Sequence, residues 1–229
     1  MGEVMKKAKK EKVLVKISEV VGEVTLKTAL SAIPIAGTFV STIYDVFKDG
    51  IYKERFEKWS SIVEARLNKL EITVGELNNN ENFATMLIKT TELAIKTSQK
   101  EKLDYLANAL RNSITANLDE DRIIIFMALL EKHTITHINI LKKGVETITK
   151  ERKKINQFRI GVTPRQLIGI KSSVDKLEDS LFNKCYRDLF LDCLVVDLDI
   201  SFNDHSVGDI VTNLGKEYLE FISIQKEAE

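Results

Sequence analysis

The stretch NLDEDRIIIFMALLEKHTITHINILKKGVE, residues 117–146, decides how we interpret the fold. Asp119 stands where an N-cap is expected, and acidic residues follow it in the first turn. Lys142, Lys143 and Gly144 would make a suitable helix end. The stretch therefore predicts one long helix. Because its apolar residues cover much of its circumference, we expect this helix to lie at the centre of a bundle.

Amphipathic helices are also predicted in the part of the chain before this stretch, where apolar residues recur at intervals of three and four. The predicted helices span, in order, residues 11–33, about 38–71, 81–98 and 99–114. Asn80 is a suitable N-cap for the third of them. The positions expected to face a core are Val40, Ile43, Phe47, Ile51, Phe56, Trp59, Val63, Leu67 and Leu70, then Phe83, Met86, Leu87, Thr90, Leu93 and Ala94, and then Leu103, Leu106, Ala107, Leu110 and Ile114.

The most apolar part of the N-terminal region, ALSAIPIAGTFVSTIYDVF at residues 29–47, contains Pro34 and Gly37. A spanning helix needs about twenty predominantly apolar residues, and here a proline interrupts a shorter run that is rich in Ser and Thr. We expect an N-terminal helical hairpin that turns at Pro34–Gly37 and packs on the bundle. The alternative is membrane contact through residues 6–47, because a lysine-rich leader over residues 1–12 precedes the apolar turn.

The character of the chain changes after the charged run TKERKKINQFR, residues 149–159. Thr163 and Pro164 suit the start of a short helix. A longer helix over residues 172–196 is predicted to turn Val174, Leu177, Leu181, Cys185 and Leu189 inward. Short β-prone pieces then flank the turn NDHSVGD, and Thr212 or Asn213 caps a last helix. This order predicts a small C-terminal winged-helix-like module with a short β-hairpin.

Charge separates the two predicted parts, although the whole chain has no net formal charge. Residues 1–159 contain 27 Lys and Arg against 21 Asp and Glu, whereas residues 160–229 contain 7 against 13. We therefore predict a mainly α protein with a flexible basic leader over residues 1–12, a helical bundle over 13–150 and an acidic α+β module over 160–229. The N-terminus lacks the continuous apolar run of a signal peptide, which predicts a cytoplasmic protein.

The motif HTITH places His133 and His137 four residues apart, which on one helix is a single turn. This spacing could chelate a metal, but a metalloprotease would need Glu at the position of Thr134. We expect instead that both histidines pack at the edge of the core, each with a hydrogen-bond partner. No metal ligands and no cofactor are predicted.

Recognisable chemical motifs are otherwise missing from the sequence. Cys185 and Cys193 are eight residues apart, a spacing that common zinc and redox motifs do not use, so buried packing of reduced thiols is expected. No phosphate-binding loop, nucleophile elbow or kinase-like set of residues occurs. We predict no enzymatic activity and no catalytic residues. Nucleic acid is not an expected partner, because the predicted wing is crowded with aspartates that would repel phosphate: Asp192, Asp197, Asp199, Asp204 and Asp209.

Three stretches carry a resemblance to a group of bacterial helical proteins: ENFATMLIKTTELAIKTSQKEKLDYLANALRNSI, THINILKKG and IVTNLGKEYLEFI. In outline the chain is similar to the abortive-infection alpha family over most of residues 29–222. The resemblance implies a helical N-terminal part joined to a small C-terminal module, and a part in defence against phage. It implies no catalytic residues.

These observations lead to three hypotheses about function. The first is a non-catalytic protein that acts through protein–protein contacts in anti-phage defence, with self-association left open. The second is a membrane-disrupting effector that uses the N-terminal amphipathic hairpin at the inner face of the membrane. The third is an enzyme without a recognisable motif.

Overall fold

The computed structural model describes residues 50–67, 80–116, 118–155, 176–196 and 210–224. The described part is mainly helical, with seven helices and no strand, which confirms the predicted mainly α class. The predicted leader, the turn at Pro34–Gly37, the helix start at Thr163–Pro164 and the turn NDHSVGD lie outside these residues.

The chain divides into two compact units, Met1–Lys96 and Thr97–Glu229. The sequence predicts a boundary elsewhere, between residues 150 and 160. That boundary falls partly in residues 156–175, which the structure does not describe, so the predicted domains stay a prediction.

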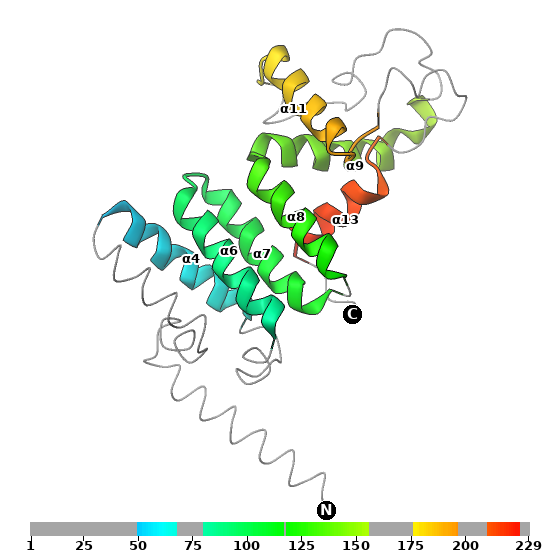
Figure 1. The fold of residues 1–229 in the computed structure, drawn as a ribbon. Coiled ribbons are helices and arrows are strands. Elements are labelled where there is room, and N and C mark those ends of the chain that lie inside the picture. Colours follow the sequence, from blue (N-terminus) through cyan, green and yellow to red (C-terminus); the bar gives the residue numbers. More distant parts are fainter. Residues whose placement is uncertain (1–49, 68–79, 117, 156–175, 197–209, 225–229) are drawn as a thin grey trace, which may run out of the picture. The chain divides into compact units, whose positions relative to one another are not determined.

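In the first unit, α4 (Ile51–Leu67) packs against α6 (Glu81–Lys96), and Figure 1 shows the two helices side by side. Phe56, Trp59 and Val63 are buried on α4, as the spacing predicts. The indole Nε1 of Trp59 donates a hydrogen bond to the Thr91 hydroxyl at 3.1 Å, so the largest buried side chain also has its polar atom satisfied.

Of the two helix starts in this unit, that of α6 agrees with the prediction and that of α4 does not. Asn80 caps α6 as predicted, since its side-chain Oδ1 accepts from the Phe83 N–H at 2.9 Å. The predicted continuous helix from Thr38 to Glu71 is wrong at Gly50. This residue has φ of +81°, which a right-handed helix does not allow, and α4 begins only after it. Ile51, predicted to face the core, is 61% exposed.

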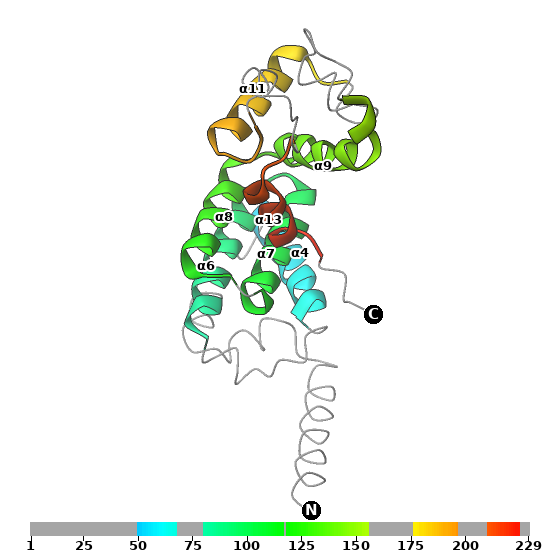
Figure 2. The same ribbon diagram turned by 90° about the vertical axis from the view of Figure 1, so that its right-hand side faces the viewer.

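The second unit contains α7 (Lys100–Thr115), α8 (Glu120–Lys132), α9 (Ile135–Ile155), α11 (Asp179–Leu191) and α13 (Asn213–Phe221). Helix α7 packs against α8 and α13, and α9 packs against α11 and α13. Both views place α9 between α11 and α13 (Figures 1 and 2). The largest side chains of its core are Leu106, Leu110, Phe126, Met127, Leu130, Ile138, Phe182, Tyr218 and Phe221.

The stretch 117–146 does not form the single helix predicted. It breaks between α8 and α9, whose axes turn by 116°. The beginning was predicted correctly, because the Asp119 side chain accepts from the Arg122 N–H at 2.8 Å. The predicted end at Lys142–Gly144 is wrong, because α9 continues to Ile155. Gly144 is needed for packing instead: a Cβ there would lie 2.8 Å from Cγ2 of Val211.

No single helix among the described residues is long and apolar enough to cross a membrane. Helix α8 and residues 135–146 of α9 reach that composition only together, across the 116° bend.

The C-terminal part agrees with the sequence in part. Thr212 is the N-cap of α13, accepting from the Gly215 N–H at 3.0 Å. Val195 and Val211 form one isolated antiparallel bridge. Cys185 and Leu189 are buried as predicted, but Leu181 is 47% exposed, because Phe182 and Tyr186 form the buried face of α11.

The end of α11 explains why Cys193 is not buried as predicted. Cys193 N donates to Phe190 O at 2.9 Å and Leu194 N donates to Leu189 O at 2.9 Å, the two hydrogen bonds of a Schellman motif. The motif requires a left-handed residue after the C-cap, and Cys193, with φ of 59°, takes that position. Cys193 is exposed, whereas Leu189 and Leu194, the residues joined by the second of these two hydrogen bonds, are buried.

Helix α7 holds the end of α13 through two asparagines that the sequence analysis did not single out. The buried Nδ2 of Asn112 lies 2.8 Å from Phe221 O, 2.9 Å from Ser223 O and 3.2 Å from Glu220 O. One turn earlier, Asn108 Nδ2 donates to Ile222 O at 3.2 Å. Glu220 O also accepts from Ser223 N at 3.2 Å, whereas the carbonyls of Phe221, Ile222 and Ser223 lie at or beyond the last residue of α13. Helix α7 therefore supplies donors to the C-terminal end of α13.

Candidate functional site

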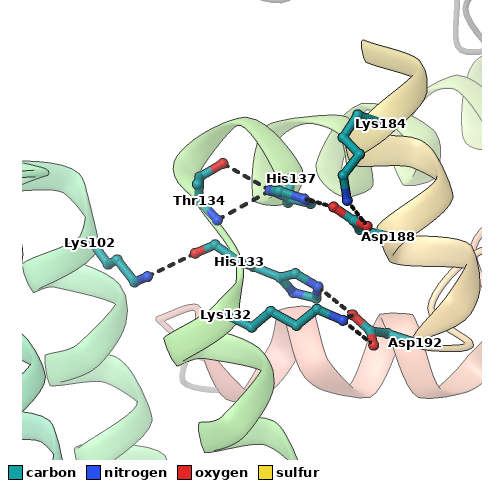
Figure 3. Close-up of polar contacts among 8 residues, drawn as sticks. All are labelled: Lys102, Lys132, His133, Thr134, His137, Lys184, Asp188 and Asp192. Carbon is teal, nitrogen blue, oxygen red and sulfur yellow. Dashed lines mark hydrogen bonds and ion pairs between the residues drawn. The ribbon is translucent and has the colours of Figure 1, made fainter. Parts of the chain in front are cut away.

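The break between α8 and α9, which we call the elbow (residues 132–137), gathers the motif HTITH with two aspartates of α11 (Figure 3). His133 is the C-cap of α8, with its own N–H bonded to Leu129 O at 2.8 Å. Thr134 then precedes the first residue of α9, and His137 lies in the first turn of that helix. The histidines thus stand on opposite sides of a helix break, and the predicted single-turn spacing on one helix is wrong.

His137 stabilises the start of α9 in the way that Glu does in a capping box. Its Nδ1 lies 3.2 Å from the backbone N of Thr134 and 2.9 Å from the Thr134 hydroxyl. In the sequence pattern S/T-x-x-E, the glutamate accepts a hydrogen bond from the N-cap N–H. Here the imidazole of T-x-x-H takes that place, which explains why a new helix can begin with only His133 and Thr134 between it and the preceding one.

This contact determines which nitrogen of His137 carries the proton. A backbone N–H can only donate, so Nδ1 must be an unprotonated acceptor. Nε2 therefore carries the hydrogen and points to Asp188 Oδ2 at 3.4 Å, a long hydrogen bond. Lys184 Nζ approaches the other oxygen of Asp188 at 2.5 Å, and this contact is the main reason that the pKa of Asp188 is lowered.

His133 forms a shorter pair with the second aspartate. Its Nε2 lies 2.9 Å from Asp192 Oδ2, and Lys132 Nζ lies 2.7 Å from both oxygens of the same carboxylate. Asp192 is the C-cap of α11, so the pair joins the end of α11 to the end of α8. Figure 3 shows the two histidine–aspartate pairs one above the other between the same helices.

The two imidazoles stack on each other, with 5.0 Å between ring centroids and 21° between ring planes. Burial lowers the pKa of His133 to about 4, although the hydrogen bond to Asp192 opposes the shift. Burial also lowers the pKa of His137, against the opposing effect of Asp188. Both rings are therefore neutral near pH 7, which avoids placing two charges in one stack.

A buried lysine supports the elbow from α7. Lys102 Nζ donates to His133 O at 2.8 Å and to Glu131 O at 3.0 Å, which are carbonyls at the C-terminal end of α8. A positive charge is favourable at that end of a helix. Burial lowers the pKa of Lys102, while Glu131 opposes this change.

The geometry of the elbow favours a structural role for its polar groups. His133 is fully buried and His137 is 7% exposed, and each Nε2 faces an aspartate. Among the described residues there is no group of three or more His, Cys, Asp or Glu side chains that could hold a metal ion. The expectation of histidines at a core edge, each with a hydrogen-bond partner, is confirmed. His205 and most of the predicted wing lie outside the described residues.

The partners of the histidines were missed by the sequence analysis. Asp188 and Asp192 are four residues apart on α11, as His133 and His137 are at the elbow, and this matching interval is the only signal in the sequence that could have paired them. Lys102 gives no local signal, because its acceptors are backbone carbonyls about thirty residues away.

Comparison of the chain with known proteins found no matching family model, no matching curated protein and no matching solved structure.

Proposed function

We propose that this protein acts without catalysis, through contacts with another protein, and that its setting is bacterial defence against phage by abortive infection. The proposal of a non-catalytic protein rests on the elbow, where the titratable side chains pair with one another inside the protein. The imidazoles of His133 and His137 are buried, and Nε2 of each faces an aspartate, so these two titratable groups join helices within the unit. The setting rests on the sequence resemblance described above.

We also propose that residues 160–229 form a winged-helix-like module, with a short β-hairpin that includes the bridge between Val195 and Val211. Two backbone hydrogen bonds support this proposal. Val196 N donates to Ile210 O at 2.9 Å and Thr212 N donates to Leu194 O at 3.1 Å, so they bracket the bridge as an antiparallel ladder would. The intervening residues 197–209 contain four aspartates and no lysine or arginine.

The charge of this segment indicates what it would bind. Phosphate backbones would be repelled, whereas a basic protein surface would be attracted. The proposed partner is therefore a protein that presents Lys and Arg to the acidic segment.

Phage challenge of bacteria with and without the gene tests the proposal, together with affinity purification of the protein during infection. The informative variant changes Asp197, Asp199, Asp204 and Asp209 to Asn. Its matched control changes four exposed acids elsewhere to the corresponding amides: Glu92, Glu101, Glu120 and Asp121. We expect the first variant to lose both protection and a co-purifying protein, and the control to keep both. Equal protection by cells with and without the gene, across a broad phage panel, would remove the defence role.

The alternative function is a membrane-disrupting effector at the inner face of the membrane. It rests on the lysine-rich leader that precedes the apolar segment at residues 29–47. Expression would then be toxic, and changing Lys6, Lys7, Lys9, Lys10 and Lys12 to Glu would relieve the toxicity. Toxicity that persists in this variant, without binding to anionic liposomes, would contradict it.

A further inference from the structure

Two buried polar atoms next to the elbow have no hydrogen-bond partner among the described residues. They are Nδ1 of His133 and the hydroxyl of Tyr218, on α13. Both side chains are fully buried. Their rings meet edge to face, with 5.9 Å between centroids and 66° between planes. Unpaired buried polar groups are rare because their desolvation is not compensated, so two in one contact require an explanation.

The two atoms are complementary in hydrogen bonding. Nε2 of His133 faces Asp192 at 2.9 Å, and a carboxylate can only accept, so Nε2 carries the hydrogen. Nδ1 is then a free acceptor. The pKa of Tyr218 is raised, mainly by burial, so the Tyr218 hydroxyl is protonated and can donate a hydrogen bond. The two contacting rings thus carry one buried donor and one buried acceptor, and no hydrogen bond joins them.

We propose that one buried water molecule bridges the Tyr218 hydroxyl and Nδ1 of His133. Two hydrogen bonds of about 2.8 Å each give the water enough reach to join groups in neighbouring rings. It accepts from Tyr218 and donates to Nδ1, which supplies the two partners that a buried water needs at minimum.

The water site extends the elbow network to α13. A continuous chain would run from Tyr218 on α13, through the water and His133, to Asp192 at the end of α11 and Lys132 on α8. This role differs from the proposed function, since it concerns the interior of the unit and requires no partner protein.

Matched Tyr→Phe variants of the full chain test the site, because each removes one oxygen. Tyr218→Phe removes the proposed donor to water. Tyr186→Phe is the reference, since the Tyr186 hydroxyl donates directly to Val196 O at 3.0 Å. We expect both changes to lower the folding equilibrium constant by about fivefold in urea unfolding. If Tyr218→Phe folds as stably as the wild type or more so, its hydroxyl was unpaired and the proposal is overturned.

A second measurement uses the wild-type protein and does not depend on the variants folding. A high-resolution crystal structure is expected to contain an ordered water within about 3.2 Å of both Tyr218 Oη and His133 Nδ1. The absence of such a water, or a direct hydrogen bond between the two atoms, would overturn the inference.

Discussion

Lowering the pH should destabilise the protein in a window set by His133. Burial lowers the pKa of His133 to about 4, from 6.5 for an unperturbed histidine. Between these two pH values His133 is protonated in the unfolded chain and neutral in the folded protein. Stability should therefore fall as the pH falls from about 6.5 to about 4, and it should be fully present above this window. A difference of about 2.5 pKa units corresponds to about 3 kcal/mol.

His137 should add to this loss of stability at low pH, because burial also lowers the pKa of His137. Protonating His137 would in addition place a hydrogen on Nδ1, opposite the Thr134 N–H that donates to it. The capping contact at the start of α9 would then be lost. Asp188 acts at lower pH, because Lys184 lowers its pKa from 3.8, and its contribution to stability disappears only as the pH falls through the lowered value.

The assay is urea unfolding followed by circular dichroism at pH 7.5, 6.5, 5.5 and 4.5, for the wild type and a His133→Gln variant. Subtracting the two curves removes the contribution of titrating groups that do not interact with His133. We expect the wild type to lose about 2–3 kcal/mol more than the variant between pH 7.5 and 4.5. Parallel curves, or a wild type that gains stability relative to the variant on acidification, would refute the burial of a neutral His133.

Three substitutions test the packing described above. Asn112→Ala should cost about 2–3 kcal/mol in urea unfolding, because it leaves the last carbonyls of α13 buried without donors, whereas the exposed Asn183→Ala on α11 should cost less than about 0.5. Gly215→Ala should lower the thermal midpoint more than Gly144→Ala, since its Cβ would lie 2.3 Å from the backbone oxygen of Leu194, whereas the Gly144 Cβ meets only a side chain. Cys193→Gly should stabilise the protein by about 0.5–1 kcal/mol, because it relieves a left-handed non-glycine residue with an exposed side chain; a lower stability than Cys193→Ala would contradict this.

Local signals predicted several features of the fold correctly. Asn80, Asp119 and Thr212 cap helices where the sequence placed or allowed caps, since capping depends on residues three positions apart. The buried face of α4 followed from its helical spacing for the same reason. The exposure of Leu181 could not be predicted in this way. Which face of α11 is buried depends on how Phe182 packs against the rest of the unit, and that is a tertiary property.

Residues 117–146 were predicted as a single helix because the prediction relied on apolar periodicity. Apolar periodicity continues through HTITH, so a test for amphipathicity does not detect the break. At the break, the neutral imidazole of His137 accepts from the Thr134 N–H, as the carboxylate of a capping box does, and also contacts the Thr134 hydroxyl. The same imidazole must stay neutral to accept the Thr134 N–H, and it is then free to donate to Asp188 fifty-one residues away. One local contact therefore turns the chain and also orients the side chain for the long-range pair. A histidine is suited to both tasks because its neutral ring has one acceptor and one donor on opposite sides.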